Sequence, residues 1–344
     1  MFTNFLNLWI LARVVQAGVA TSLCGLGTIL GLRIARRWRS GQSSETQLAL
    51  ERQAELVASV MQVALLFEIL GLALTVLVTN HLVGGIRGAM CAFGVLASTS
   101  TGFLGLAVSV ATAVACGLWM TLHRFDLTLE LPVLTRRKFL ALLAVGPLAL
   151  LDLALVLRFA FELDFSVIAS CCSVWVDDTA INARAARWVM SPNPTALLGV
   201  ASAGSALIAG LALWRRPGRA TALTAATLAA IAPLAVLPAI LGVIAPYATA
   251  TPGHLCPFCL FHAQGGYVGW PLFAALFVGS VAGMGAGVVE LNRSIAGADA
   301  PARTLQRRLG RRSAIGWACV LGCGAFPVIR YLILSRGVSV FGEV

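Results

Sequence analysis

The sequence predicts an all-α polytopic membrane helix bundle, with about eight transmembrane helices and both termini extracytoplasmic. Of its 344 residues, 59% are hydrophobic and only 11% are charged, whereas an ordinary soluble domain carries about 25% charged residues. Apolar runs of roughly 20 residues recur along the chain, and a spanning segment in lipid must satisfy its own backbone hydrogen bonds, as a helix does. Basic residues gather in every second loop. These observations predict a single integral membrane domain covering residues 1–344.

The net charge of +11 would suggest a nucleic-acid partner if the protein were soluble. Here the basic residues lie between apolar runs, so they indicate membrane orientation, and we expect the lipid bilayer and no nucleic acid as a partner. The expected helices cover residues 8–32, 56–79, 102–122, 139–161, 195–214, 220–244, 272–289 and 313–334. The expected outer loops cover residues 80–101, 162–194 and 245–271.

The first helix, 8–32, ends in the basic run 33–39, Arg-Ile-Ala-Arg-Arg-Trp-Arg. By the positive-inside rule this end lies in the cytoplasm. No basic residue and no small-residue cleavage site precedes the apolar run, so we expect a retained helix and not a cleaved signal peptide. The segment 40–53 is polar and is expected to form a short surface helix. The second helix, 56–79, returns to the outer side.

The third helix, 102–122, ends in His123-Arg124. Together with the basic residues 136–138, this end forms the second cytoplasmic loop. The fourth helix, 139–161, leads to the longest outer segment, 162–194.

The fifth helix, 195–214, stops at the arginine-rich segment 215–219. The sixth helix, 220–244, contains Pro233 and Pro238. Proline inside a spanning helix usually produces a kink, which neighbouring helices can accommodate. We therefore expect the sixth helix to be kinked.

The seventh helix, 272–289, follows the outer segment 245–271. An arginine-rich loop, 293–312, separates it from the eighth helix, 313–334. Most of the 25 Lys and Arg residues fall in the loops assigned to the cytoplasm. The exceptions are Arg87, Arg184, Arg187 and Arg336 on the outer side, and Arg13, Arg158 and Arg330 within helices or near their ends.

This orientation divides the nine cysteines into two groups. The outer group consists of Cys91, Cys171, Cys172, Cys256 and Cys259. The remaining four, Cys24, Cys116, Cys319 and Cys323, lie inside predicted helices, where small cysteines usually pack. Thiols in an oxidising outer compartment are paired, metal-bound or catalytic. We expect a multi-pass protein of the cell inner membrane with such thiols on its periplasmic face.

The motif Cys256-Pro257-Phe258-Cys259 is the strongest candidate site. Proline is favoured at the first helical position, which makes Cys256 a helix N-cap residue at the mouth of the seventh helix. Backbone N–H groups and the helix dipole there favour a thiolate. Cys256 is then the attacking sulfur and Cys259 its resolving partner in thiol–disulfide exchange. The expected electron relay consists of Cys91, Cys171 and Cys172.

The four-residue motif is similar to the active site of glutaredoxins. It also resembles the membrane disulfide oxidases of the DsbB and vitamin K epoxide reductase type, which place a Cys-x-x-Cys at the outer end of a helix beside a quinone. That resemblance implies a quinone cofactor, a second outer cysteine pair and an extracytoplasmic thiol protein as a partner. It covers about ten residues; those families use about four helices, and their second pair is not formed by adjacent cysteines such as Cys171-Cys172.

The flanking histidines support a second interpretation. His254, Cys256, Cys259 and His262 offer two thiolates and two imidazoles, a ligand set that suits zinc or copper. The protein would then handle or transport a metal, with a metal-carrying protein as partner. A third interpretation is a membrane subunit or permease with structural disulfides only, joining Cys256 to Cys259 and Cys91 to Cys171 or Cys172.

Two acidic residues are expected near the middle of the membrane. Intramembrane charges are functional candidates, so Glu68 and Asp152 could carry protons to a quinone or along a transport path. The structural alternative is a buried helix–helix pair or a protonated acid bonded to a neighbour. Arg13 lies nearer the outer end of its helix, where snorkelling can relieve its charge.

Overall fold

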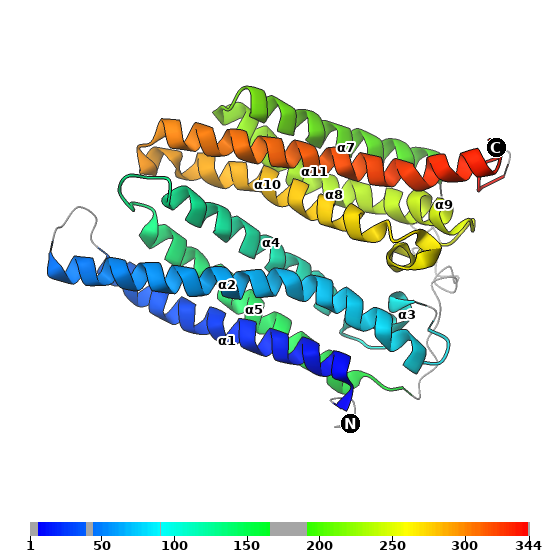
Figure 1. The fold of residues 1–344 in the computed structure, drawn as a ribbon, viewed down its shortest axis with the longest axis horizontal. Coiled ribbons are helices and arrows are strands. Elements are labelled where there is room, and N and C mark those ends of the chain that lie inside the picture. Colours follow the sequence, from blue (N-terminus) through cyan, green and yellow to red (C-terminus); the bar gives the residue numbers. More distant parts are fainter. Residues whose placement is uncertain (1–5, 39–43, 90, 166–190, 343–344) are drawn as a thin grey trace. The chain divides into compact units, whose positions relative to one another are not determined.

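The computed structural model describes residues 6–38, 44–89, 91–165 and 191–342 (Figure 1). Within these ranges every regular element is a helix and no strand is present. Eight helices are long and apolar enough to cross a membrane. The predicted all-α polytopic fold is therefore confirmed, and the protein is a multi-pass membrane protein.

The long helices are α1 (Leu8–Arg37), α2 (Glu45–Leu82), α4 (Gly102–Asp126), α5 (Thr135–Glu162), α7 (Pro192–Arg215), α8 (Arg219–Ala239), α10 (Gly269–Ala296) and α11 (Asp299–Leu334). The short α-helices are α3 (Ala92–Ala97) and α9 (Ala245–Thr249). The other short elements are the 3-10 helices η2 (Val83–Gly85), η5 (Pro257–Phe261) and η6 (Ala263–Gly265) and the π-helix η4 (Ile240–Ile244).

Two of the long helices extend well beyond their apolar runs. α2 begins at Glu45, where the Ser44 side chain caps it by accepting a hydrogen bond from the Gln47 backbone N–H. α11 begins at Asp299, so the arginine-rich segment expected to be a loop is helical. Hydropathy locates the lipid-embedded part of a helix, whereas Glu, Gln, Ala, Leu and Arg are all good helix formers. The helices therefore continue into polar surroundings.

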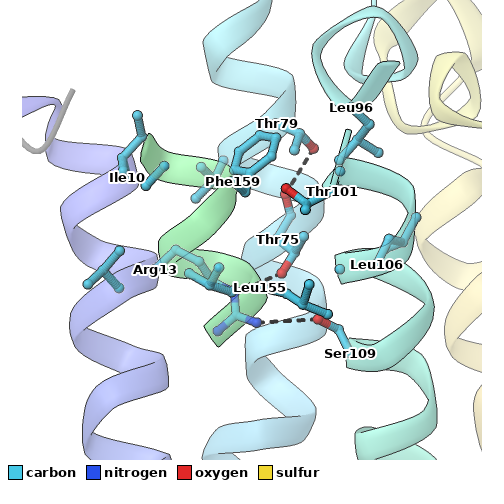
Figure 2. Close-up of a pocket in the computed structure, with 16 residues that line it drawn as sticks. Ile10, Arg13, Thr75, Thr79, Leu96, Thr101, Leu106, Ser109, Leu155 and Phe159 are labelled. Carbon is cyan, nitrogen blue, oxygen red and sulfur yellow. Dashed lines mark hydrogen bonds between the residues drawn. The ribbon is translucent and has the colours of Figure 1, made fainter. Parts of the chain in front are cut away.

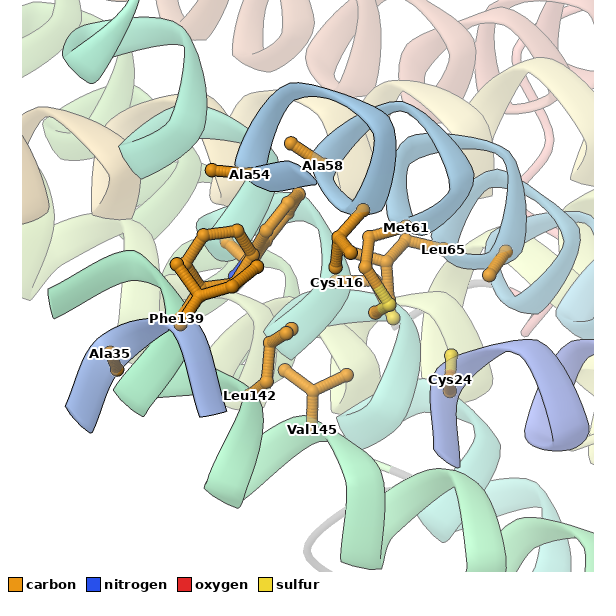
Figure 3. Packing of buried hydrophobic residues seen from close by; sticks show 14 of the residues in the cluster. Cys24, Ala35, Ala54, Ala58, Met61, Leu65, Cys116, Phe139, Leu142 and Val145 are labelled. Carbon is orange, nitrogen blue, oxygen red and sulfur yellow. The ribbon is translucent and has the colours of Figure 1, made fainter. Parts of the chain in front are cut away.

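The chain forms two compact units, of which the first consists of Met1–Arg87, Val95–Ala169 and Val288–Ala302. In it, α1, α2, α4 and α5 form a four-helix bundle in which each helix packs against two others. Figure 3 shows the buried centre of this bundle, a cluster that includes Met61, Leu65 and Phe139 together with Cys24 and Cys116. These two cysteines are fully buried, as expected for packing residues.

The second unit consists of Gly88–Gly94, Ser170–Gly287 and Arg303–Val344. Its helices approach one another through small residues. A Cβ atom added at Gly316 would lie 2.6 Å from the Cα of Gly279, and one added at Gly199 would lie 2.4 Å from the Cβ of Ala239. Small residues allow such close backbone contact, on which helix association in lipid depends. Trp317 is fully buried in this core.

The prolines of α8 affect the helix differently. Pro233 lies inside α8 without ending it, whereas Pro238 lies one residue before the end of α8, where the π-helix η4 begins. Proline removes a backbone donor, and a π-helical turn is one way in which a helix adjusts its hydrogen bonds. The adjustment precedes α9 and the segment that contains the Cys-x-x-Cys motif.

Candidate functional site

Three cysteines converge in the second unit. The sulfur atoms of Cys91, Cys256 and Cys259 all lie within 4.8 Å of one another. The Sγ atoms of Cys91 and Cys256 are 3.1 Å apart, although the residues are separated by 165 positions in the sequence. Three of the five predicted outer cysteines therefore form one cluster, which we call the thiol cluster.

The N-cap position predicted for Cys256 is confirmed. Cys256 has an extended backbone conformation (φ −99°, ψ 112°) and precedes the 3-10 helix η5, with Pro257 in its first turn. The tight turn returns the chain so that Cys259 lies close to Cys256. The backbone N–H of His262 then donates to the carbonyl oxygen of Cys259 at 3.2 Å and closes the turn.

The predicted position at the mouth of the seventh helix was wrong. That helix, α10, begins at Gly269, and η5 is a separate element of five residues. The field of aligned peptide dipoles grows with the length of the helix and acts on its first turn. A single 3-10 turn therefore gives the Cys256 sulfur less electrostatic support than a long helix would.

Glycines allow the chain to fold back over the motif. A Cβ atom added at Gly265 would lie 2.5 Å from the carbonyl oxygen of Cys259, and one added at Gly269 would lie 3.0 Å from the carbonyl carbon of Leu260. Gly266 has a φ of +65°, a left-handed conformation that glycine adopts without strain. The segment that covers the motif thus depends on residues without side chains.

The three cysteines of the thiol cluster are buried. Cys91, Cys256 and Cys259 expose 1%, 0% and 6% of their surface. Cys91 directly precedes α3, and its carbonyl oxygen accepts a hydrogen bond from the Gly94 backbone N–H at 3.0 Å. Beside Cys259, Leu260 is fully buried and Phe261 nearly so. Water is therefore largely excluded from the three sulfurs.

The aromatic side chains beside the motif form a compact group. The Phe261 ring packs edge-on against Trp270, with centroids 4.9 Å apart, and stacks on Phe273 at 5.4 Å. These contacts connect the end of η5 to the first two turns of α10. They fix the position of the segment that carries Cys259.

No disulfide joins any two of the cysteines that the structure describes. The separation of 3.1 Å between Cys91 Sγ and Cys256 Sγ is a thiol–sulfur contact in which either atom could donate, since a disulfide bond is about 2.05 Å long. Two sulfurs this close can form a disulfide after a small movement. Three sulfurs at these distances can also bind a soft metal ion.

The two histidines do not join the thiol cluster. Among the described residues, the group of converging metal-ligand side chains contains the three thiols and neither His254 nor His262. The Nε2 atom of His254 is buried and has no hydrogen-bond partner in this part of the chain. The third possible metal ligand beside Cys256 and Cys259 is Cys91, and not one of the two histidines of the predicted ligand set. The predicted relay residues Cys171 and Cys172 lie outside the described residues.

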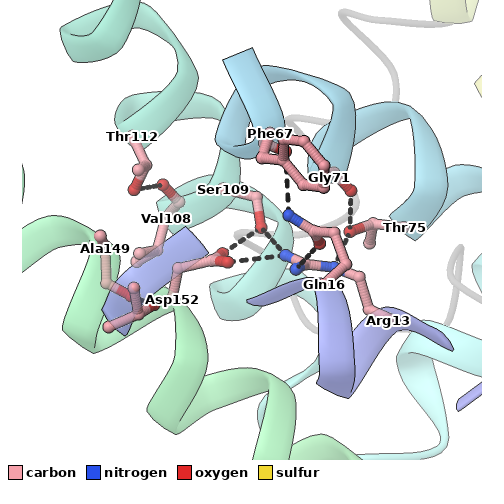
Figure 4. A network of polar contacts seen from close by, with 11 residues as sticks. Arg13, Gln16, Phe67, Gly71, Thr75, Val108, Ser109, Thr112, Ala149 and Asp152 are labelled. Carbon is pink, nitrogen blue, oxygen red and sulfur yellow. Dashed lines mark hydrogen bonds and ion pairs between the residues drawn. The ribbon is translucent and has the colours of Figure 1, made fainter. Parts of the chain in front are cut away.

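The intramembrane charges lie in the first unit, where Asp152 forms an ion pair. Its Oδ2 atom lies 2.6 Å from an Arg13 nitrogen, and both side chains are almost fully buried. Figure 4 shows the surrounding network, in which Ser109 donates to Asp152 and the Arg13 Nε donates to Thr75 at 2.8 Å. The predicted snorkelling of Arg13 was wrong, because a partner on another helix neutralises it within the bundle.

Glu68 remains apart from this ion pair. It exposes 4% of its surface, and its Oε1 atom has no hydrogen-bond partner among the described residues. A buried carboxylate without a partner is unfavourable. A role for Glu68 and Asp152 in proton movement stays a prediction.

A small cavity adjoins the polar network. Figure 2 shows Arg13, Thr75 and Ser109 lining it together with apolar side chains such as Leu106 and Phe159. Its volume is about 40 Å³, and a water molecule occupies about 30 Å³ in the liquid. The cavity therefore has room for a water molecule.

Comparisons with known proteins identified no relative: no family model matches the chain, and no curated protein or solved structure matches it.

Proposed function

We propose that this membrane protein carries out thiol–disulfide exchange through the thiol cluster, on the periplasmic side of the inner membrane. The observation that supports this most strongly is the 3.1 Å contact between Cys91 and Cys256, with Cys259 also within 4.8 Å. Because the Cys256 sulfur lies near both Cys91 and Cys259, a disulfide of Cys256 with one of them can be exchanged for a disulfide with the other. The asymmetry of basic residues in the sequence supports the outer location.

The first exchange takes place between the Cys256 sulfur and a disulfide of an extracytoplasmic protein. The Cys256 thiolate attacks one sulfur of that disulfide, so that a mixed disulfide forms and the second partner sulfur leaves as a thiolate. The Cys259 thiolate then attacks Cys256 Sγ and displaces the first partner sulfur. The partner is reduced to a dithiol, and the motif is oxidised to a Cys256–Cys259 disulfide.

The second exchange is internal. The Cys91 thiolate attacks Cys256 Sγ, the Cys256–Cys259 bond breaks, a Cys91–Cys256 bond forms and Cys259 leaves as a thiolate. No electrons are gained or lost in this step, because one disulfide replaces another. Cys256 is the shared sulfur, and Cys91 passes the disulfide away from the motif. The reverse sequence of steps would oxidise a partner dithiol.

Because the thiol cluster is buried, the internal exchange and the exchange with a partner protein differ in the movement of the chain that they need. Cys91 and Cys256 are already in contact and nearly free of solvent exposure, so the internal exchange needs no access from outside. A protein partner, in contrast, must reach Cys256 or Cys259 through the segment 260–269 that covers them. We therefore expect this segment to move when a partner reacts.

Disulfide mapping of the reduced protein tests the proposal. After one equivalent of dithiodipyridine is added, mass spectrometry should detect two alternative disulfides that share Cys256, one with Cys259 and one with Cys91. Cys116→Ser is the matched control, because that cysteine is buried in the first unit and its loss should leave the pattern unchanged. A pattern that never includes Cys91 would overturn the internal exchange.

Soft-metal binding is the second candidate function, and the convergence of three thiols favours it. A metal–sulfur bond of about 2.3 Å places two sulfurs about 3.8–4.0 Å apart around a shared ion. Sulfurs that all lie within 4.8 Å of one another need only small shifts to reach that geometry. Thiolates without hard oxygen ligands suit copper(I) or zinc.

Metal analysis separates the two candidates. The reduced protein would be incubated anaerobically with one equivalent of copper(I) or zinc and then passed through a desalting column. Retention of one ion per chain, lost in Cys91→Ser and kept in Cys116→Ser, would favour the metal function. Exchange of disulfides at the cluster without metal retention would favour the redox function.

A further inference from the structure

The second unit carries a concentration of arginines at one end. Arg215 and Arg216 lie at the end of α7, and Arg219 begins α8. Four more arginines follow one another along α11: Arg307, Arg308, Arg311 and Arg312. We call these residues, from α7, α8 and α11 together, the arginine surface.

Close backbone contact brings the two groups of arginines together. A Cβ atom added at Gly310 would lie 2.6 Å from the backbone nitrogen of Trp214, and one added at Gly210 would lie 2.9 Å from that of Ala314. α7 and α11 therefore touch one residue before Arg215 and one residue before Arg311. Glycine at 210 and 310 permits this approach.

The arginines of α11 point away from the core. Positions 307, 308, 311 and 312 lie on one face of the helix and are exposed, whereas Gln306, Leu309 and Ser313 between and beside them are buried. The guanidinium of Arg311 lies over the Trp214 ring, 5.9 Å from its centroid. This contact holds one charge of α11 beside the arginines of α7.

The described residues of the second unit offer these arginines no acidic partner. Neither aspartate nor glutamate occurs among the described residues of that unit, which are 88–89, 91–94, 191–287 and 303–342. The first unit differs, because Lys138 lies 2.6 Å from Asp126 and Arg293 lies 2.6 Å from Asp299. Neighbouring like charges repel one another, so anions from outside the unit would stabilise the arginine surface.

The position of the arginine surface relative to the membrane determines which anions can reach it. The apolar parts of α7 and α11 begin directly beside these arginines, and Trp214 is the kind of residue that lies at the interface between lipid and water. From Arg219 the candidate span reaches Thr249, roughly 45 Å at 1.5 Å per residue, before the segment that carries Cys256. The arginine surface and the thiol cluster thus lie at opposite ends of the unit, and the surface is at the level of the lipid headgroups.

We propose that the arginine surface binds the phosphate headgroups of anionic phospholipids. Guanidinium groups donate paired hydrogen bonds to phosphate oxygens, and arginine suits this geometry better than lysine. Arginines from three helices can surround one headgroup while its acyl chains follow the apolar surfaces of α7 and α11. The lipid would hold the ends of these helices together without any acidic residue of the chain.

Native mass spectrometry of the full-length protein tests this. The protein would be placed in nanodiscs with equal amounts of phosphatidylglycerol and phosphatidylcholine, and the lipids retained after release would be counted. We expect selective retention of phosphatidylglycerol. The variant R307Q/R308Q/R311Q/R312Q should lose it, with a fall in apparent affinity of about fivefold for each arginine removed.

The control removes the same amount of charge from the first unit. R33Q/R36Q/R37Q/R136Q replaces four exposed arginines that the positive-inside rule assigns to the same membrane side, and it should retain phosphatidylglycerol as the wild type does. A second variant, R215Q/R216Q/R219Q, should lose the lipid even if the α11 variant fails to fold. Equal losses in variant and control, or no selective retention by the wild type, would overturn the proposal. So would equal protection of the lipid-free protein against heat by inorganic phosphate, which would identify a soluble phosphate as the ligand.

Discussion

The sulfur atoms of Cys91 and Cys256 lie 3.1 Å apart, in a cluster from which water is largely excluded. The two residues are carried by different segments of the second unit, one just before α3 and one just before η5. Their contact makes Cys256 a neighbour of two sulfurs at once. Exchange between disulfides and soft-metal binding both depend on that arrangement.

Removal of Cys256 should have a larger effect than removal of Cys91. In Cys256→Ser the shared sulfur is absent, so we expect neither of the two proposed disulfides after mild oxidation. In Cys91→Ser the Cys256–Cys259 disulfide should still form. Mass spectrometry of linked peptides identifies the disulfides in the two variants. Absence of the Cys256–Cys259 disulfide from Cys91→Ser would contradict the prediction.

Gly265→Ala should disturb the cover of the thiol cluster. The added Cβ atom would lie 2.5 Å from the Cys259 carbonyl oxygen, so the turn must shift, at a cost of about 1–3 kcal/mol in the free energy of unfolding. The rate of alkylation of the cluster cysteines in the native state should rise. Gly204→Ala is the control, because nothing lies within 4 Å of its added Cβ. Unchanged alkylation in Gly265→Ala would show that the turn tolerates the methyl group.

Asp152→Asn should destabilise the first unit strongly. The change leaves the buried Arg13 guanidinium without its ion-pair partner, and breaking such a pair costs about 3–5 kcal/mol. Thermal unfolding in detergent measures the effect. Glu162→Gln, which breaks the more exposed pair with Arg158, should have much less effect. Comparable destabilisation by the two variants would argue against a special role of the buried pair.

Glu68→Gln should leave the stability unchanged or raise it. The Glu68 side chain is buried and one of its oxygens has no described partner, so replacing the carboxyl by a neutral amide removes a group that is costly to bury in charged form. The same thermal unfolding assay applies. A marked loss of stability would show that the carboxyl makes an interaction essential to the bundle.

Much of the fold could be predicted from the sequence. The apolar runs located the eight spanning helices, because a segment that crosses lipid must be apolar. The same runs did not locate the ends of the helices. α2 and α11 continue through polar residues such as Glu45 and Arg307. There, helix propensity and capping stabilise the helix, and the hydropathy of the sequence does not reveal it. The separation into two compact units was not visible in the sequence. The single membrane domain stays a prediction.

The candidate site was predicted in part. The motif identified Cys256 and Cys259, and its proline identified the N-cap. The choice of Cys91 over His254 and His262 as the third member depends on how distant segments pack, which spacing along the chain does not reveal. A buried helix–helix pair was among the alternatives for Asp152, but its partner Arg13 was not identified, for the same reason. Their opposite charges inside two spanning helices were the available signal.

Disulfide mapping of the Cys259→Ser protein tests the exchange mechanism most directly. This variant keeps the Cys91–Cys256 contact and removes the competing sulfur. After mild oxidation of the reduced protein in membranes, we predict a Cys91–Cys256 disulfide as the main product, identified by mass spectrometry of linked peptides. If Cys91 and Cys256 both remain thiols, or each pairs with a different cysteine, the proposed internal exchange is contradicted.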